Sequence, residues 1–405
     1  MYLTGEEERI LRGESGPALQ KLMSILVALG DIYGAERLIP VGSAQVAGVS
    51  YKSLGDAGIE WIESLKGIQA SVPSTLNTAG MDLNLWRRMG VSEEFADKQL
   101  RIIRAYRELG ITLICSCTPY LCGNVPRFGE HIAWSESSAV CYANSLLGAR
   151  TNREGGPSAL ASAIIGKTPY YGYHLDDIRE PTLMVRVSAE LSEESDFGCL
   201  GHWAGRIAES GVPYFTGLEA ATGDELKALA AALASSGGVA MFHVQDITPE
   251  SMRVSKSGVK TVEFEETDLK GTYSELTTAI GGRVDLVCFG CPHVSIEEIK
   301  RIADLLDGER IASGTRLWVF TSLCTKGIAE RSSLLNRIQR AGGEVYSDCC
   351  MVVAPLEELG FETIAVNSAK AATYSPTVSK MDVVFSTLQG CVEMAMTGRV
   401  QLRGG

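Results

Sequence analysis

The chain has 405 residues, of which 45% are hydrophobic and 21% charged; this composition is typical of a folded globular protein and excludes a largely disordered one. Its formal net charge of −12 argues against nucleic acid or an anionic membrane as the main partner. An anionic small molecule remains compatible with that charge if donors are placed locally. The chain contains 11 Cys but only 5 His, and this imbalance is the feature of the composition to explain.

The N-terminal sequence MYLTGEEERILRGE is acidic and lacks an apolar stretch, so we do not expect a signal peptide. The longest uncharged run lies between Lys227 and Asp246, and its composition indicates a buried helix and strand rather than a membrane span. These observations predict a cytoplasmic protein whose thiols stay reduced. An odd number of Cys also fits poorly with a closed disulfide framework.

Short apolar runs alternate with helical patterns along the chain. Thr4 and Glu7 have the spacing of a capping box for a first helix. Further helices are predicted at 18–33, 295–306, 325–340 and 387–396. Strands are predicted at 37–41, 111–115, 183–187, 239–244, 284–288, 317–321, 344–346, 363–366 and 383–385. This alternation predicts an α/β fold with largely parallel sheets.

Two stretches interrupt the alternation and suggest domain boundaries. One is rich in Tyr, Gly and Pro at 172–182, and the other is polar and poor in core residues at 251–272. We therefore predict an N-terminal α/β region at 1–175, a second at 176–270 and a C-terminal region at 271–405.

Cysteines cluster where predicted strands end. Cys115 and Cys117 follow the strand at 111–115, Cys288 and Cys291 follow 284–288, and Cys349 and Cys350 follow 344–346. Ligand sites in open α/β sheets lie beyond the carboxyl ends of the strands, so three such loops could bring three thiolates together. Three thiolates without an obvious fourth partner suit an iron–sulfur cluster with one open iron, which could act as a Lewis acid on a substrate oxygen.

Two other interpretations of these cysteines stay open. Free Cys is often a small buried hydrophobic residue. The CFGC segment has the C-x-x-C spacing of a zinc site, although no second pair accompanies it. Cys141, Cys199 and Cys391 lie within helical patterns and are expected in the core. Cys122 and Cys324 lie in predicted loops and have no partner in the sequence.

A polar stretch at 133–159 contains a second group of candidate residues. Ser135, Glu136, Ser137 and Ser138 open a helix, whose free N–H groups can attract an anion. Arg150 and Arg153 follow it and could bind a carboxylate or phosphate by paired hydrogen bonds. A capped surface helix followed by a solvated charged turn is the alternative.

The run at 42–58 follows a predicted strand and consists mainly of small residues, so its backbone N–H groups could form an anion nest. It matches neither a Walker loop nor the dinucleotide-binding fingerprint, and an ordinary strand-to-helix turn is the alternative. His293 could be a ligand, an acid–base group, a hydrogen-bond donor behind a cluster, or a structural residue.

The motifs SAQVAGVSYKSLGDAG, CTPYL, AWSESSAV, ANSLLGARTNREGGPSAL, GCPH and the loop at 348–350 together resemble the aconitase X family, over essentially the whole chain. The resemblance implies an aconitase-like α/β fold, with several α/β/α units around a central Fe–S site. It also implies a [4Fe–4S] cluster held by Cys117, Cys291 and Cys350. The family usually has one Cys where this chain has two adjacent ones, and its position in the motif favours Cys350 rather than Cys349 as the cluster ligand.

The family includes bacterial hydroxyproline dehydratases and archaeal mevalonate 5-phosphate dehydratases, and VALGDIYGAERLIP and GVSYKSLGDAGIEW are similar to the archaeal members. The resemblance therefore implies a hydro-lyase that converts (R)-5-phosphomevalonate into trans-anhydromevalonate 5-phosphate in the mevalonate pathway of isoprenoid biosynthesis. The chain ends at Gly405 without room for the family's small swivelling domain. We therefore expect a large subunit that pairs with a separate small subunit, and the general base is expected on that subunit rather than on this chain.

The substrate-binding residues implied by the resemblance are Gly48, Val49, Ser50, Asn77, Glu136, Ser137, Ser138, Arg150, Arg153 and Lys370. Two alternatives to the favoured function remain. One is a cis-3-hydroxy-L-proline dehydratase of the same family, whose substrate carries an amine and no phosphate. The other is a non-catalytic, zinc-stabilised scaffold subunit.

Overall fold

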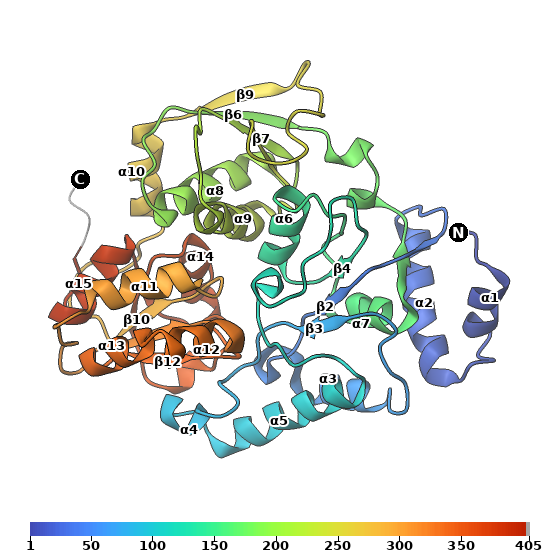
Figure 1. Cartoon of the computed structure of the whole chain (residues 1–405), viewed down its shortest axis with the longest axis horizontal. Helices are drawn as coiled ribbons and strands as arrows, with labels where there is room; N and C mark the ends of the chain where they lie inside the picture. Colours follow the sequence, from blue (N-terminus) through green and yellow to red (C-terminus); the bar gives the residue numbers. More distant parts are fainter. Residues whose placement is uncertain (402–405) are drawn as a thin grey trace.

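A computed structural model describes residues 1–401 and shows three parts, each built around its own β-sheet (Figure 1). We call them the first, second and third part; they contain the elements α1–β5, β6–α10 and β10–α15, respectively. In Figure 1 the first part (blue to green) lies on the right, the second (green to yellow) at the top and the third (orange to red) at the left.

The first part contains a three-stranded parallel sheet of order β3-β2-β4 and a separate antiparallel pair, β1-β5. Thr4 and Glu7 form the capping box that the sequence predicts for α1. The strands are β1 (Leu38–Pro40), β2 (Ala44–Val46), β3 (Ser74–Leu76), β4 (Ala133–Trp134) and β5 (Lys167–Pro169). The helices are α1 (Gly5–Leu11), α2 (Pro17–Ile32), α3 (Tyr51–Glu63), α4 (Trp86–Met89), α5 (Glu93–Glu108), η1 (Pro119–Leu121), α6 (Ser137–Ser145) and α7 (Gly156–Ile165).

Two short turns, η2 (Gly172–His174) and η3 (Asp177–Arg179), lead into the second part, whose sheet is parallel with the order β8-β7-β6-β9. Its strands are β6 (Leu183–Val187), β7 (Pro213–Thr216), β8 (His243–Val244) and β9 (Lys260–Phe264). Its helices are α8 (Glu194–Ala208), α9 (Gly223–Gly237) and α10 (Glu266–Glu275).

The third part has a five-stranded parallel sheet with the order β12-β11-β10-β13-β14. Its strands are β10 (Leu286–Phe289), β11 (Arg316–Phe320), β12 (Glu344–Tyr346), β13 (Thr363–Val366) and β14 (Asp382–Phe385). Its helices are α11 (Ile296–Leu305), α12 (Leu323–Arg331), α13 (Leu334–Ala341), η4 (Leu356–Glu358), α14 (Ala369–Val378) and α15 (Leu388–Thr397). The parallel sheets and the alternation of strands with helices confirm the predicted α/β class.

Several sequence predictions need correction. The expected strand at 111–115 is absent: Thr112 makes one isolated bridge to Thr75, and Cys115 has a φ of 47° that no extended strand adopts. The expected helix at 325–340 is two helices, because Ser333 has a left-handed φ of 61°. The polar stretch at 251–272 contains β9 and the start of α10. The sequence does not predict short strands such as β2, β3 and β4, because two or three residues carry too little pattern.

The second part depends on the close approach of α8 and α9, which lie side by side across its sheet (Figure 1). Glycines form this contact. A Cβ on Gly237 would overlap the carbonyl oxygen of Gly205, and a Cβ on Gly201 would lie 2.7 Å from the carbonyl oxygen of Leu229. The absence of side chains at these positions lets the two backbones touch.

We expect Gly237→Ala to destabilise the protein by about 1–3 kcal/mol, because the added methyl group must push α9 away from α8. Gly271→Ala in α10 is the matched control, since a Cβ there meets nothing within 4 Å and Ala favours a helix. Urea denaturation of both variants measures the difference. Equal stability of the two variants would contradict the close-packing account.

Candidate active site

The three loops that carry the predicted cluster cysteines meet at the junction of the first and third parts. Cys117 follows Ser116, whose N–H donates to the carbonyl of Leu76 at the end of β3 (3.1 Å). Cys291 follows β10, and Cys350 follows β12. β10 and β12 belong to one parallel sheet, so both loops leave its carboxyl edge, where ligand sites form.

The thiols of these loops interact with one another. A hydrogen bond with Cys350, together with burial, raises the pKa of Cys291. The same hydrogen bond lowers the pKa of Cys350 to about 7, helped by the backbone N–H groups of Val352 and Val353 and opposed by burial. Cys117 lies close enough for the charges of Cys350 and Glu136 to raise its pKa further, after burial as the main cause. Each of the three residues is buried, with 5–6% of its surface exposed.

The vicinal cysteines face different environments. The Cys349 sulfur lies 4.0 Å from the Met89 sulfur, and the Cys349 backbone bridges to Ala79 of the first part. Cys350 instead hydrogen bonds with Cys291. Cys349 therefore packs into the core between the two parts, whereas Cys350 faces the other thiols.

Cys115 and Cys288 are fully buried, and the other five remaining cysteines divide into two groups. Cys141, Cys199 and Cys391 are buried within α6, α8 and α15, which confirms the prediction that they are core residues. Cys122 and Cys324 are neighbours: burial raises the pKa of Cys122, and the Cys324 thiol lies within hydrogen-bond reach of it. Cys324 lies in the first turn of α12 and not in a loop as predicted, and local sequence pattern could not indicate its contact with Cys122, because the two residues are distant along the chain.

Among residues 1–401, no group of three or more His, Cys, Asp or Glu side chains is close enough to bind a single metal ion. A cluster of several iron atoms is larger than one ion, so its thiolate ligands stand further apart. Three buried thiols from three loops, close enough to influence one another's pKa, provide the donor chemistry that such a cluster requires. The residues present fit an iron–sulfur cluster in this respect.

A buried ion pair lies beside the thiols. Glu136 caps α6 in the first part, and Lys370 lies in the first turn of α14 in the third part. The Lys370 ammonium donates to Glu136 and to the Ser138 hydroxyl (3.4 Å), and Asn77 donates to the other Glu136 oxygen (2.7 Å). The structure thus brings together Asn77, Glu136, Ser138 and Lys370, four of the predicted substrate residues.

The ion pair determines the charge of both partners. Burial acts to raise the pKa of Glu136, but Lys370, Asn77 and Ser138 outweigh it and lower the pKa to about 2. Burial also opposes the charged form of Lys370, yet Glu136 and the Cys291 thiol raise its pKa. Both groups are therefore ionised at neutral pH, and the ammonium lies near the thiols.

The loop at 48–50, at the start of α3, contacts the segment that follows Cys350. Ser50 does not cap the helix through its side chain; its hydroxyl donates to the Val353 carbonyl (2.8 Å), near the Cys350 loop. Gly48 has a φ of 78°, which a residue with a side chain rarely adopts. The Oδ1 atom of Asn77 is buried and has no hydrogen-bond partner within the described chain. It is an acceptor available to a ligand.

Ser137, Arg150 and Arg153 are placed differently from one another. The Ser137 hydroxyl donates to Glu136 (3.5 Å), so it belongs to the same group. The Arg150 guanidinium pairs with Asp176 and donates to the His174 carbonyl (3.0 Å). Arg153 is exposed, and its guanidinium lies near Gly238 at the end of α9. The substrate-binding role of the two arginines remains a prediction.

Two contacts that the sequence did not suggest support the loops. The Ser368 hydroxyl, at the start of α14, donates to the Cys291 carbonyl. Behind the same loop, the buried Lys227 of α9 pairs with Glu298 and Asp224 (2.8 Å to Asp224). The sequence does not reveal that Lys227 is buried, because one of its acidic partners, Glu298, lies in α11, far from α9 along the chain.

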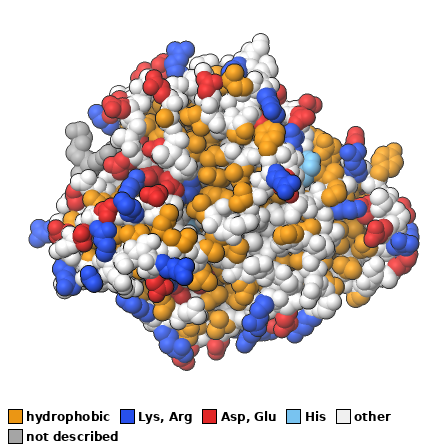
Figure 2. Space-filling view, in the orientation of Figure 1, with side chains coloured by type: hydrophobic (Ala, Val, Ile, Leu, Met, Phe, Trp, Pro, Cys, Tyr) orange, Lys and Arg blue, Asp and Glu red, His pale blue; other side chains and the backbone are white. Residues whose placement is uncertain are grey.

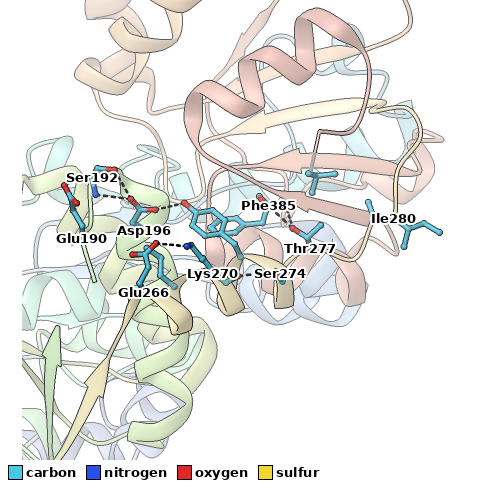
Figure 3. A pocket seen from close by; sticks show the side chains of 13 residues that line it. Glu190, Ser192, Asp196, Glu266, Lys270, Ser274, Thr277, Ile280 and Phe385 are labelled. Carbon is cyan, nitrogen blue, oxygen red and sulfur yellow. Dashed lines mark hydrogen bonds and ion pairs between the residues drawn. The ribbon is translucent and has the colours of Figure 1, made fainter. Parts of the chain in front are cut away.

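A separate cavity of about 760 Å³ lies between α8, α10 and β14 (Figure 3). Its lining includes Asp196, Glu266, Lys270, Tyr273 and Phe385, and none of the thiols. The Asp196 carboxylate already accepts hydrogen bonds from Ser192 and from the Tyr273 hydroxyl (2.8 Å). The chemistry of the thiols and the ion pair therefore marks the candidate site better than cavity size does.

Three family models match the chain: "Aconitase X first domain" over residues 1–177, "Aconitase X second domain" over 181–274 and "Aconitase X third domain" over 284–397. The chain is 54% identical over 388 residues to a protein of Methanothermobacter thermautotrophicus named phosphomevalonate dehydratase large subunit, covering 95% of this chain and 96% of that protein. A Methanocaldococcus jannaschii protein of the same name is 48% identical over 410 residues, covering 98% and 100%.

A Pseudomonas aeruginosa protein named cis-3-hydroxy-L-proline dehydratase is more distant, at 34% identity over 97% of this chain and 70% of that protein. Among solved structures, the holo-form of Thermococcus kodakaraensis aconitase X superposes with a TM-score of 0.91 at 44% identity, covering 98% of this chain and 100% of that one. Within the described chain, no helix is both long and apolar enough to cross a membrane.

Removing one partner of the buried ion pair should be costly. We expect Glu136→Gln to destabilise the metal-free chain by about 3–5 kcal/mol at pH 7, because Lys370 is left buried without a counter-charge. Adding Lys370→Met should restore part of that loss. Since the pKa of Glu136 is lowered from 4.5 to about 2, its contribution should decrease as the pH falls from 4.5 towards 2.

Urea denaturation at several pH values measures these differences. Glu63→Gln is the matched control, because the Glu63–Arg101 pair is exposed and should contribute little. If Glu136→Gln were as stable as wild type at pH 7, or if Lys370→Met made it less stable, the account of the pair would be wrong.

Proposed function

The chain belongs to the aconitase X family, and we propose that it is the large subunit of an iron–sulfur dehydratase acting on (R)-5-phosphomevalonate. The product is trans-anhydromevalonate 5-phosphate, an intermediate of the mevalonate pathway. The observation that carries this proposal is the meeting of three buried thiols with the Glu136–Lys370 pair at one junction. The relatives at 46–54% identity support this substrate over hydroxyproline.

In this proposal, Cys117, Cys291 and Cys350 hold a [4Fe–4S] cluster. When bound, the cluster supplies a Lewis acid for departure of the tertiary hydroxyl group. The contact between Cys350 and Cys291 supports this ligand set, and the packing of Cys349 against Met89 argues against Cys349 as a ligand.

The polar residues hold the substrate in the proposed site. Lys370 presents an ammonium group whose charge Glu136 balances, and Glu136 holds that ammonium and the Asn77 amide in place. The unpartnered Oδ1 atom of Asn77 accepts a hydrogen bond from a substrate hydroxyl. The hydroxyls of Ser137 and Ser138 donate to Glu136 and keep it in place, and the backbone N–H groups of residues 48–50 donate to the anionic groups of the substrate.

A base must remove a proton from the carbon next to the substrate carboxylate. We assign this base to a separate small subunit that closes over the site, so the active enzyme is a heterodimer or a larger assembly in the cytoplasm. The face in Figure 2 supports such a partner: hydrophobic side chains gather at its centre, where the three parts meet, and charged side chains lie mainly around the rim. Interfaces commonly combine an apolar centre with a polar rim.

Substrate choice tests the proposal directly. We expect the chain, assembled with its small subunit, to dehydrate (R)-5-phosphomevalonate and to leave cis-3-hydroxy-L-proline unchanged, because the relatives that act on the latter are more distant. Product formation measured by mass spectrometry distinguishes the two. Turnover of hydroxyproline alone would contradict the proposal. A colourless, anaerobically purified protein with stoichiometric zinc and no iron would favour a scaffold subunit.

Cysteine substitutions test the ligand set. Cys117→Ser, Cys291→Ser and Cys350→Ser should each remove iron and acid-labile sulfide from the anaerobically reconstituted chain, since each would delete one thiolate. Cys349→Ser is the matched control, because its sulfur faces Met89. Iron and sulfide analysis and visible absorbance measure the outcome. If Cys349→Ser lost the cluster and Cys350→Ser kept it, the assignment within the vicinal pair would be inverted.

A further inference from the structure

His293 contacts all three cysteine loops. Its backbone N–H donates to the Cys117 sulfur (3.1 Å), its Nδ1 atom lies 3.0 Å from the Ser116 hydroxyl, and its Nε2 atom lies 2.8 Å from the Cys349 carbonyl oxygen. It is two residues from Cys291, and none of its surface is exposed. His293 thus lies next to each of the three proposed cluster ligands or to a residue adjacent to it in the chain.

The partners of the ring define its tautomer. A carbonyl oxygen can only accept, so Nε2 carries the hydrogen that bonds to Cys349. In the neutral ring Nδ1 is then the acceptor, and the Ser116 hydroxyl donates to it. The Ser116 oxygen in turn accepts from the backbone N–H of Thr118 (3.1 Å). This chain of hydrogen bonds runs from the Cys117 loop through the imidazole to the Cys350 loop.

The second part supports the backbone of His293. The buried ammonium of Lys227 donates to its carbonyl oxygen (3.4 Å) while it pairs with Asp224 and Glu298. His293 therefore has buried hydrogen bonds to all three parts of the molecule: its imidazole bonds to the first and third parts, and its backbone carbonyl bonds to the second.

We propose that His293 is the positioning residue that holds the Cys117, Cys291 and Cys350 loops in one arrangement before the cluster is bound. Buried hydrogen bonds that depend on one side chain keep the thiols preassembled, so the cluster enters a formed site rather than ordering three free loops. The inference rests on the proposed cluster site. Its first test therefore uses the metal-free chain, where failure of the function and failure of the inference give different results.

Two substitutions test the two hydrogen bonds of the imidazole one at a time. The amide nitrogen of His293→Gln reaches the position of Nε2, so it keeps the bond to Cys349 and loses the one from Ser116. The shorter His293→Asn places its amide near the position of Nδ1, so it keeps the contact with Ser116 and loses the one to Cys349. His243→Gln is the matched control: His243 is also fully buried with Nε2 2.8 Å from a backbone carbonyl, that of Arg179, in the second part.

The readout is the rate at which iodoacetamide alkylates each cysteine of the metal-free full-length chain, followed by peptide mass spectrometry. Loss of one buried hydrogen bond should open the loop concerned about tenfold more often. We expect His293→Gln to speed alkylation mainly at Cys117 and His293→Asn mainly at Cys350. Cys141, buried in α6, is the internal reference, and His243→Gln should match wild type at Cys117, Cys291 and Cys350.

A second readout follows iron loss to a chelator from the anaerobically reconstituted variants, which should be about tenfold faster in both His293 variants than in His243→Gln. Unchanged alkylation in both His293 variants would overturn the inference. An equal increase at Cys117, Cys350 and Cys141 would also overturn it, since this would be general destabilisation. If wild type bound no iron but the alkylation pattern were as expected, the proposed function would fail while the preassembly of the three loops would stand.

Discussion

The buried ion pair between Glu136 and Lys370 is the interaction on which the site depends. It joins the capping residue of α6 in the first part to the first turn of α14 in the third part. Removing two charges from water is expensive, and the cost is recovered only when each charge also has good hydrogen bonds. Asn77 and Ser138 provide these bonds to Glu136, so the pair links the two parts at the site.

A second buried carboxylate holds the Cys350 loop against the first part. Asp82 accepts from the N–H of Ser347 (2.9 Å), from the N–H of Leu85 (2.8 Å) and from the Lys326 ammonium (3.2 Å). The first contact is to the third part and the second orders the turn before α4. Asp82 contacts the start of the Cys350 loop and Glu136 contacts the start of α14, while His293 hydrogen bonds to Ser116 and to Cys349. The geometry of the thiols is therefore determined by contacts between parts rather than within one loop.

This distribution of contacts explains what the sequence could and could not predict. The helices of the third part and the longer strands follow from hydrophobic periodicity, and the Cys-bearing loops at 291 and 350 follow from their place after such strands. No regular strand precedes the Cys117 loop. Its position was still predicted correctly, since the apolar segment before it runs beside β3 with strand-like hydrogen bonds. Local pattern could not show that Cys349 and Cys350 face opposite ways, since that depends on Met89 and Cys291. It also could not show that Arg150 pairs with Asp176.

Charge balance adds a constraint on how an anionic substrate is held. Lys370 is already compensated by Glu136, so the pair as a whole carries no net charge to offer a carboxylate and a phosphate together. Arg150 is likewise paired, and Arg153 is exposed at the surface near α9. Neutralisation must therefore come from dipoles, such as the backbone N–H groups at 48–50, and from positive charge that is brought to the site when it closes. A substrate with a phosphate at one end and a reacting hydroxyl at the other would then be oriented by this chain and fully enclosed only with a partner. This requirement follows from the charges of the described residues, and it reconciles the net charge of −12 with the anionic substrate proposed above.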